Sequence, residues 1–232
     1  MHRQTSIFAL LLFCCGFAAP ARAQANLHST LPPAAGGDSA GQTVDGIAAR
    51  IEEDILTDSE VNELAAFQTL VDGHEKSRDD LIRELTDQWI VRGEAAATKY
   101  PEPSAPDVDN AYNQLAMQFA SPDQFRARCR EVGLTEAAIR RLLAQQLYLS
   151  RFLDFRFRPA AQVDDQQVAA YYKDEFAPQL RKRGDTVPPL EDVEDTIREV
   201  LIQRAISERA TSWLDETRAR LHIDVIAGDG SQ

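Results

Sequence analysis

The sequence is poor in the residues on which most metal sites and many catalytic sites depend. Among 232 residues it has four histidines and three cysteines. Cys14 and Cys15 stand in an N-terminal apolar run, so Cys129 is the only thiol in the rest of the chain and no internal disulfide is possible there. Because Cys129 occupies an apolar position of a predicted helix, we expect it to be buried and unreactive.

Several motifs for catalysis are also missing. His-Glu-x-x-His, the Walker loop and Gly-x-Gly-x-x-Gly do not occur. The histidines beyond the N-terminal run, His28, His74 and His222, are scattered and are interpreted as surface residues. Residues Glu52–Asp54 are interpreted as a solvated turn and Arg181–Arg183 as part of a solvated loop. We therefore expect no catalytic residues, no metal and no cofactor.

Basic residues are in the minority. The chain has 25 Lys and Arg against 37 Asp and Glu, a net charge of −12 at pH 7. Removal of the first 23 residues takes away two arginines and no acid, and leaves −14. Such acidity argues against nucleic acid and anionic membrane surfaces as partners, and it suits a soluble protein.

The N-terminus has the pattern of a secretory signal peptide. An apolar run from Ile7 to Ala19 follows Arg3 and precedes the small-residue site Ala21-Arg22-Ala23. It is too short for a stable membrane span, so cleavage after Ala23 is expected. A lipid anchor on Cys15 is the alternative, although Phe13 and Cys14 stand where small residues are needed.

Composition divides the remaining chain into three parts. Residues 24–42 are rich in Pro, Gly, Ser and Ala without apolar periodicity, which indicates a disordered tether. Residues 43–226 carry the periodic apolar patterns of one folded domain. The last residues, 227–232, are expected to form a flexible tail.

The two ends of the folded part have strand patterns. Ile47–Thr57 predicts a hairpin that turns at Glu53–Asp54, and Thr57 with Glu60 predicts a capping box. A hairpin alone is marginally stable, so a third strand is needed. The only plausible one is Leu221–Ile226, and the termini are therefore expected to meet in one small antiparallel sheet.

Between these strands the patterns are helical throughout, which makes the fold class mostly α. Residues 177–187, with the basic triplet, are expected to be a loop between two helices. The last helix is expected to be about 45 Å long at 1.5 Å per residue. A first helix is capped by Thr57, and a third is predicted to begin at Asp107. The other predicted helices span residues 78–98, 122–133, 135–156, 163–176 and 190–220.

The helix 135–156 carries more apolar surface than one core needs. Tyr148, Phe152 and Phe155 form an aromatic stripe opposite its main apolar stripe. One interpretation is packing beneath another helix, with the C-terminal helix as the first candidate. The other is a partly exposed groove for apolar segments of another protein, to which Met117 would add an adaptable contact. These four residues are the candidate client-binding site.

The order of elements resembles the N-terminal chaperone domain of the SurA family of periplasmic folding factors. The resemblance rests on Thr57–Val61, Leu81–Ile90, Phe125–Leu134 and Thr135–Phe157, and on the secretory signal before them. Family members commonly carry parvulin-type prolyl isomerase domains inserted after the helix that corresponds to Val163–Phe176. Residues 177–187 leave no room for such a domain, which needs at least about 50 residues.

The resemblance implies an ATP-independent periplasmic chaperone, and the missing isomerase domain implies that this chain is not an enzyme. Its clients would be unfolded or partly folded exported proteins, such as outer-membrane proteins, without stable membrane insertion. Two other functions stay open, a minimal prolyl isomerase and an interaction or scaffold subunit with one fixed partner. A homodimer also stays open, because two chains could bury each other's apolar stripes.

Overall fold

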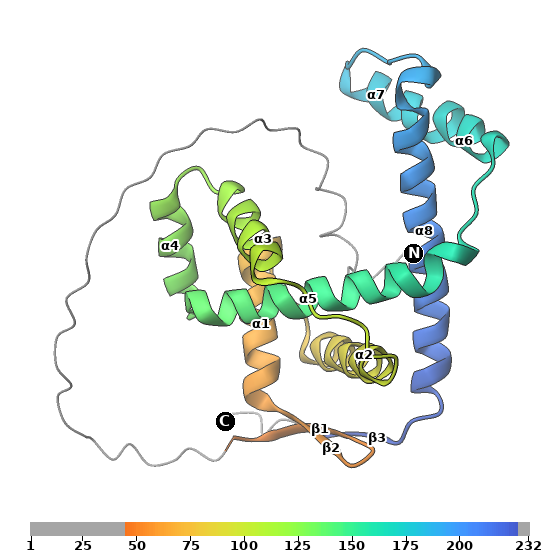
Figure 1. Ribbon diagram of the computed structural model, residues 1–232. Helices are drawn as coiled ribbons and strands as arrows, with labels where there is room; N and C mark the ends of the chain where they lie inside the picture. Colours follow the sequence, from red (N-terminus) through yellow and green to blue (C-terminus); the bar gives the residue numbers. More distant parts are fainter. Residues whose placement is uncertain (1–44, 227–232) are drawn as a thin grey trace. The chain divides into compact units, whose positions relative to one another are not determined.

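The computed structural model describes residues 45–226, which are mostly helical with one small sheet (Figure 1). The predicted signal peptide, tether and tail, and His28, lie outside the described residues. From Gly46 onward the described residues belong to one compact unit. In the described part, no helix is long and apolar enough to cross a membrane.

The sheet joins the two ends of the described chain, as predicted. Its antiparallel strands are β1 (Ile47–Ile51), β2 (Asp54–Thr57) and β3 (Ile223–Val225), in the order β2-β1-β3. A register shift between Ile47 and Ala49 places both Ala48 and Ala49 in the interior. The central strand is therefore anchored by burial as well as by pairing on both sides.

The hairpin turns one residue earlier than predicted. Glu52 has a left-handed φ of 51°, and Asp54 is already the first residue of β2. Asp54 accepts a hydrogen bond from the Trp89 indole nitrogen at 2.7 Å, and the Glu52 carboxylate accepts one from the His222 amide at 2.8 Å. Asp54 and Glu52 therefore have separate partners, and the predicted turn is confirmed at residues 52–53.

Two helices cover the sheet. Helix α1 (Asp58–Asp72) begins at the predicted capping box of Thr57 and Glu60. Helix α2 (Arg78–Ala97) lies within one residue of its predicted bounds. Their apolar faces and the inner face of the sheet form one core of Ala48, Ala49, Ile51, Leu56, Val61, Leu64, Leu81, Ile82 and Leu85.

A second core lies beneath the next three helices. Helix α3 is Ala105–Met117, α4 is Pro122–Glu131 and α5 is Glu136–Phe157. Ser121 and Thr135 cap α4 and α5 as predicted, whereas α3 begins two residues before Asp107, at a capping box with Ser104. The buried residues are Phe67, Leu70, Leu115, Phe125, Cys129, Leu134, Ile139 and Leu143.

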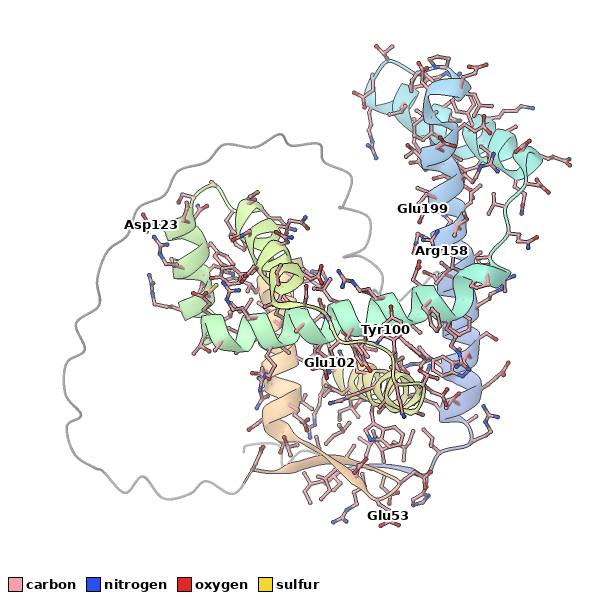
Figure 2. All side chains as sticks on the ribbon, viewed as in Figure 1. Glu53, Tyr100, Glu102, Asp123, Arg158 and Glu199 are labelled. Carbon is pink, nitrogen blue, oxygen red and sulfur yellow. The ribbon has the colours of Figure 1, made fainter. Side chains whose placement is uncertain are left out.

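The long helix α8 (Leu190–Arg218) packs against α5, α2 and α6 (Asp165–Tyr171). Between α5 and α6 lies a 3-10 turn, η2 (Arg158–Ala160). Figure 2 shows Arg158 beside Glu199 of α8, to which its guanidinium donates two hydrogen bonds of 2.7 and 3.0 Å. This paired contact fixes the end of α5 on α8.

The predicted loop at residues 177–187 is wrong for most of its length. A π-helical segment, η3 (Tyr172–Phe176), continues from α6 and leads into α7 (Ala177–Arg183). Pro178 would clash with the carbonyl of Asp174 in a regular α-helix, and the wider π turn removes that conflict. The basic triplet is therefore the last turn of a helix, where cations are favoured, and only residues 184–189 connect α7 to α8.

Candidate functional site

The four predicted client-binding residues differ widely in exposure. Phe152 is 1% exposed and belongs to the interior, while Phe155 is 62% exposed and Met117 79% exposed. Tyr148 is half-buried. The prediction that Phe152 contacts a partner is therefore wrong, because the protein itself covers this side chain.

Tyr100 covers the stripe. Its ring centroid lies 5.9 Å from that of Tyr148, 5.5 Å from that of Phe152 and 5.3 Å from that of Phe155. The Tyr148 hydroxyl also donates a long hydrogen bond of 3.4 Å to the Tyr100 carbonyl. We call Tyr100, Tyr148, Phe152 and Phe155 the aromatic cluster. Cover by the C-terminal helix was one of the two interpretations of the stripe; in the structure these ring contacts come from the segment after α2.

The end of α2 fixes the position of Tyr100. Lys99 is left-handed, with φ of 54°, and its N–H donates to the Ala96 carbonyl at 3.0 Å. The Tyr100 N–H donates to the Ala95 carbonyl at 2.9 Å. These two bonds make a Schellman motif, which turns the chain sharply and directs Tyr100 toward α5 (Figure 2). Lysine adopts this conformation at a cost that glycine would avoid.

Ion pairs flank the aromatic cluster on α5. Arg151 donates to Asp107 at the start of α3, with an Nη1–Oδ2 distance of 3.0 Å. Arg151 first, and then Ser104, hold the pKa of Asp107 well below its usual range. Arg156 donates to Glu94 of α2 at 3.1 Å and lies over the Trp213 ring of α8 at 4.6 Å.

The two ion pairs have a common effect on α5. They tie it to α3 and α2 on either side of Phe155, and Arg156 adds a contact with the Trp213 ring of α8, while Phe155 stays 62% exposed. The helix that carries the exposed Phe155 is therefore held in place by its neighbours.

Met117 lies away from this cluster. It ends α3, near Tyr112, whose ring packs against Phe125 of α4 and under the Arg140 guanidinium. Arg140 precedes Phe155 by 15 residues on α5, which corresponds to about 22 Å along a helix. The structure therefore does not bring Met117 together with the other candidates.

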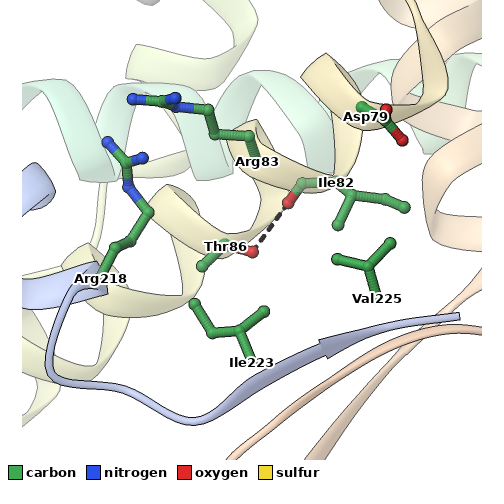
Figure 3. Close-up of a pocket in the computed structure, with 7 residues that line it drawn as sticks. All are labelled: Asp79, Ile82, Arg83, Thr86, Arg218, Ile223 and Val225. Atoms are coloured by element: carbon green, nitrogen blue, oxygen red, sulfur yellow. Dashed lines mark hydrogen bonds between the residues drawn. The ribbon is translucent and has the colours of Figure 1, made fainter.

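A second feature, which the sequence analysis missed, is an open hollow of about 320 Å³ between α2 and β3 (Figure 3). Ile82 and Thr86 of α2 face Ile223 and Val225 of β3 across it, and Val225 is 55% exposed. In the sequence, the alternation of Leu221, Ile223 and Val225 indicates the strand. It does not indicate the hollow, because α2, which faces the strand, lies more than a hundred residues earlier. The remaining lining residues are Asp79, Arg83 and Arg218.

Charged residues at one side of the hollow are paired with each other. The Arg218 Nε lies 2.7 Å from Oδ1 of the buried Asp87, and the Arg83 Nη2 lies 2.9 Å from Oδ1 of Asp215. Arg218 also pairs with Asp215. Burial raises the pKa of Asp87 to about 6, although Arg218 and Arg83 act in the opposite direction. This network joins the end of α8 to α2 just before the chain enters β3.

Groups suited to other chemistry are scattered in the described residues. No set of three or more His, Cys, Asp and Glu residues there could hold a metal ion. Cys129 is buried as predicted, and burial raises the pKa of its thiol. Residues 37–41, Gly-Asp-Ser-Ala-Gly, fit the Gly-x-Ser-x-Gly pattern of a serine nucleophile. That pattern needs a strand-to-helix turn around the serine, and it lies outside the described residues.

The chain matches no protein-family model, and no curated protein matches it significantly.

Proposed function

We propose that the protein is an ATP-independent chaperone of the SurA N-terminal type, which holds apolar segments of unfolded exported proteins in the periplasm. The proposed contact surface is the exposed part of the aromatic cluster, Phe155 with the rims of Tyr100 and Tyr148. Export rests on the sequence pattern at residues 1–23, and the family on the order of sequence elements.

The observation that carries the proposal is the exposure of Phe155 on a helix, α5, that its neighbours hold in place. Its ring is 62% exposed, although Tyr100 packs at 5.3 Å and ion pairs hold α5 on both sides. Aromatic rings that are already ordered offer apolar area at little cost in conformational entropy. Burying that area against a client is favourable by about 25 cal/mol per Å².

Two further features support the same function. The high negative charge would keep a complex with an apolar client soluble. The connection of residues 184–189 between α7 and α8 is far shorter than the roughly 50 residues of a small domain. It therefore gives no place for an inserted isomerase domain, which favours a holding function over the alternative of a prolyl isomerase.

The test is suppression of aggregation of an unfolded outer-membrane protein, followed by light scattering. Phe155→Ser should weaken suppression clearly while the melting temperature stays unchanged. Met117→Ser is the matched control, because it removes an even more exposed apolar side chain away from the aromatic cluster. Absence of suppression by the wild type would refute the chaperone proposal, and equal losses in both variants would refute this contact surface.

A further inference from the structure

Strand β3 is an edge strand of the sheet within the described residues. The sheet order β2-β1-β3 gives β3 a single neighbour among the described strands. At its two ends β3 bonds to β1: the Ile226 N–H donates to the Ala48 carbonyl at 2.9 Å, and the His222 carbonyl accepts from the Glu52 N–H at 3.0 Å. The opposite side of β3 has no strand partner in the described part of the chain.

The register directs two residues of β3 to this open edge. Ile223 pairs with Ile51 and Val225 with Ala49, and both pairs lie between hydrogen-bonded positions. In an antiparallel ladder such residues point their N–H and C=O groups away from the neighbouring strand. Ile223 and Val225 therefore present unpaired backbone donors and acceptors along the edge.

The side chains of the same two residues line the hollow. In Figure 3 Ile223 and Val225 rise from β3 toward Ile82 and Thr86 of α2. An open ladder edge next to an apolar hollow is the combination that binds an extended peptide by strand addition, with backbone bonds for affinity and alternate side chains in the hollow.

We propose that an extended apolar segment of an unfolded polypeptide adds to β3 as a fourth, antiparallel strand. Its residues opposite Ile223 and Val225 would exchange backbone hydrogen bonds with them and place their side chains in the hollow. The nature of this occupant rests on the proposed chaperone function. The site itself is separate from the aromatic cluster and recognises a backbone.

The charges around the hollow favour an unselective ligand. Arg83 and Arg218 are paired with Asp215 and Asp87, so these guanidiniums are already engaged. Recognition is thus left to the backbone and to apolar side chains, which every unfolded chain offers. A client of varied sequence fits this site better than a ligand of one charge.

A second copy of the chain fits the edge poorly. Strand β3 has three residues, whereas a stable interface buries at least about 1,000 Å². In the symmetric pairing centred on Asp224, the carboxylates of the two copies would also face each other. Short contact length and like charge both favour a transient peptide ligand.

The experiment measures binding of a fluorescent nine-residue peptide with alternating valine and threonine to the full chain by anisotropy. Val225→Pro removes an outward N–H but none that bonds to β1, so the sheet should persist. Binding should weaken at least about tenfold, as expected for a lost hydrogen bond and a blocked edge. The result contradicting the proposal is unchanged affinity in a variant with wild-type circular dichroism.

The opposite sheet edge supplies the matched control. Ile55 of β2 is 48% exposed and pairs with Arg50, whose backbone faces β3, so its N–H also points outward. Ile55→Pro should leave affinity within about twofold. Should Val225→Pro fail to fold, Val225→Lys and Ile55→Lys replace the pair, with the same expected contrast. Equal losses at both positions would overturn the proposal.

Methylated peptides test which edge of the peptide faces β3. N-methylation of the valine amides should abolish binding, whereas methylation of the threonine amides should not, because only the former face β3 in the proposed register. No binding by the wild type, or a dimer that Val225→Pro dissociates, would overturn the inference. If peptide binding is absent while Phe155→Ser still impairs suppression of aggregation, the proposed function survives without this site.

Discussion

Helix α2 connects two regions that are held together in opposite ways. Beyond its C-terminal end, Tyr100 completes an apolar cluster, and one ring of that cluster, Phe155, stays in solvent. Along its middle, Arg83 and Asp87 join α8 through charges that pair with each other. The first region leaves Phe155 in solvent, whereas beside the second region the outward backbone groups of β3 and the Val225 side chain are exposed. The exposed groups noted in these two regions are thus apolar side chains and backbone, while the charges of the junction are paired with each other.

The largest expected effect separates the two phenylalanines of the aromatic cluster. Phe152→Ala should lower the free energy of unfolding by about 3–5 kcal/mol, because it opens a cavity in a packed interior. Phe155→Ala should change it by less than about 0.5 kcal/mol, as at other exposed sites. Urea denaturation of both variants provides the measurement. Similar losses in the two would mean that Phe155 is also part of the core.

The second expected effect concerns the charged junction and pH. Burial raises the pKa of Asp87 from 3.8 to about 6, so between these values the folded state keeps a proton that the unfolded state has released. Stability contributed by this group is therefore present below pH 4 and lost as pH rises to about 6. The full loss is about 3 kcal/mol at 1.36 kcal/mol per pKa unit.

Asp87→Asn isolates that contribution. The variant should lack this fall, so its stability relative to the wild type should rise by about 3 kcal/mol between pH 4 and 6. Above pH 7 the two curves should run parallel, which serves as the internal control. Denaturant unfolding at several pH values measures both. Parallel curves across the whole range would show that Asp87 does not have a raised pKa.

Local chemistry made much of the fold predictable from the sequence. The starts of α1, α4 and α5 follow from Thr57, Ser121 and Thr135, whose side chains accept hydrogen bonds from amides three residues on. The strand at Leu221–Ile226 was predictable because the hairpin needed a partner. The capping signals act within a few residues, and the third strand follows from the marginal stability of an isolated hairpin.

The remaining features depend on contacts between distant segments. Tyr100 meets Phe155 only because α2 and α5 pack together, and its sequence context, a tyrosine before two prolines, indicated no more than a helix end. The hollow likewise requires α2 beside β3. The loop predicted at residues 177–187 is wrong because a π turn that accommodates Pro178 has no simple sequence pattern. Of the candidate site, Tyr148 and Phe155 lie together as predicted, Phe152 is buried beneath them, and Met117 lies elsewhere.

The most direct test of the central claim is site-specific photocrosslinking to an unfolded outer-membrane protein. A photoreactive phenylalanine analogue replaces Phe155 in one variant and Met117 in another, so that two exposed apolar positions are compared in the same fold. We expect abundant crosslinks from position 155 and few from position 117. Equal yields at the two positions, or none at position 155 while aggregation is still suppressed, would contradict the claim that the aromatic cluster binds the client.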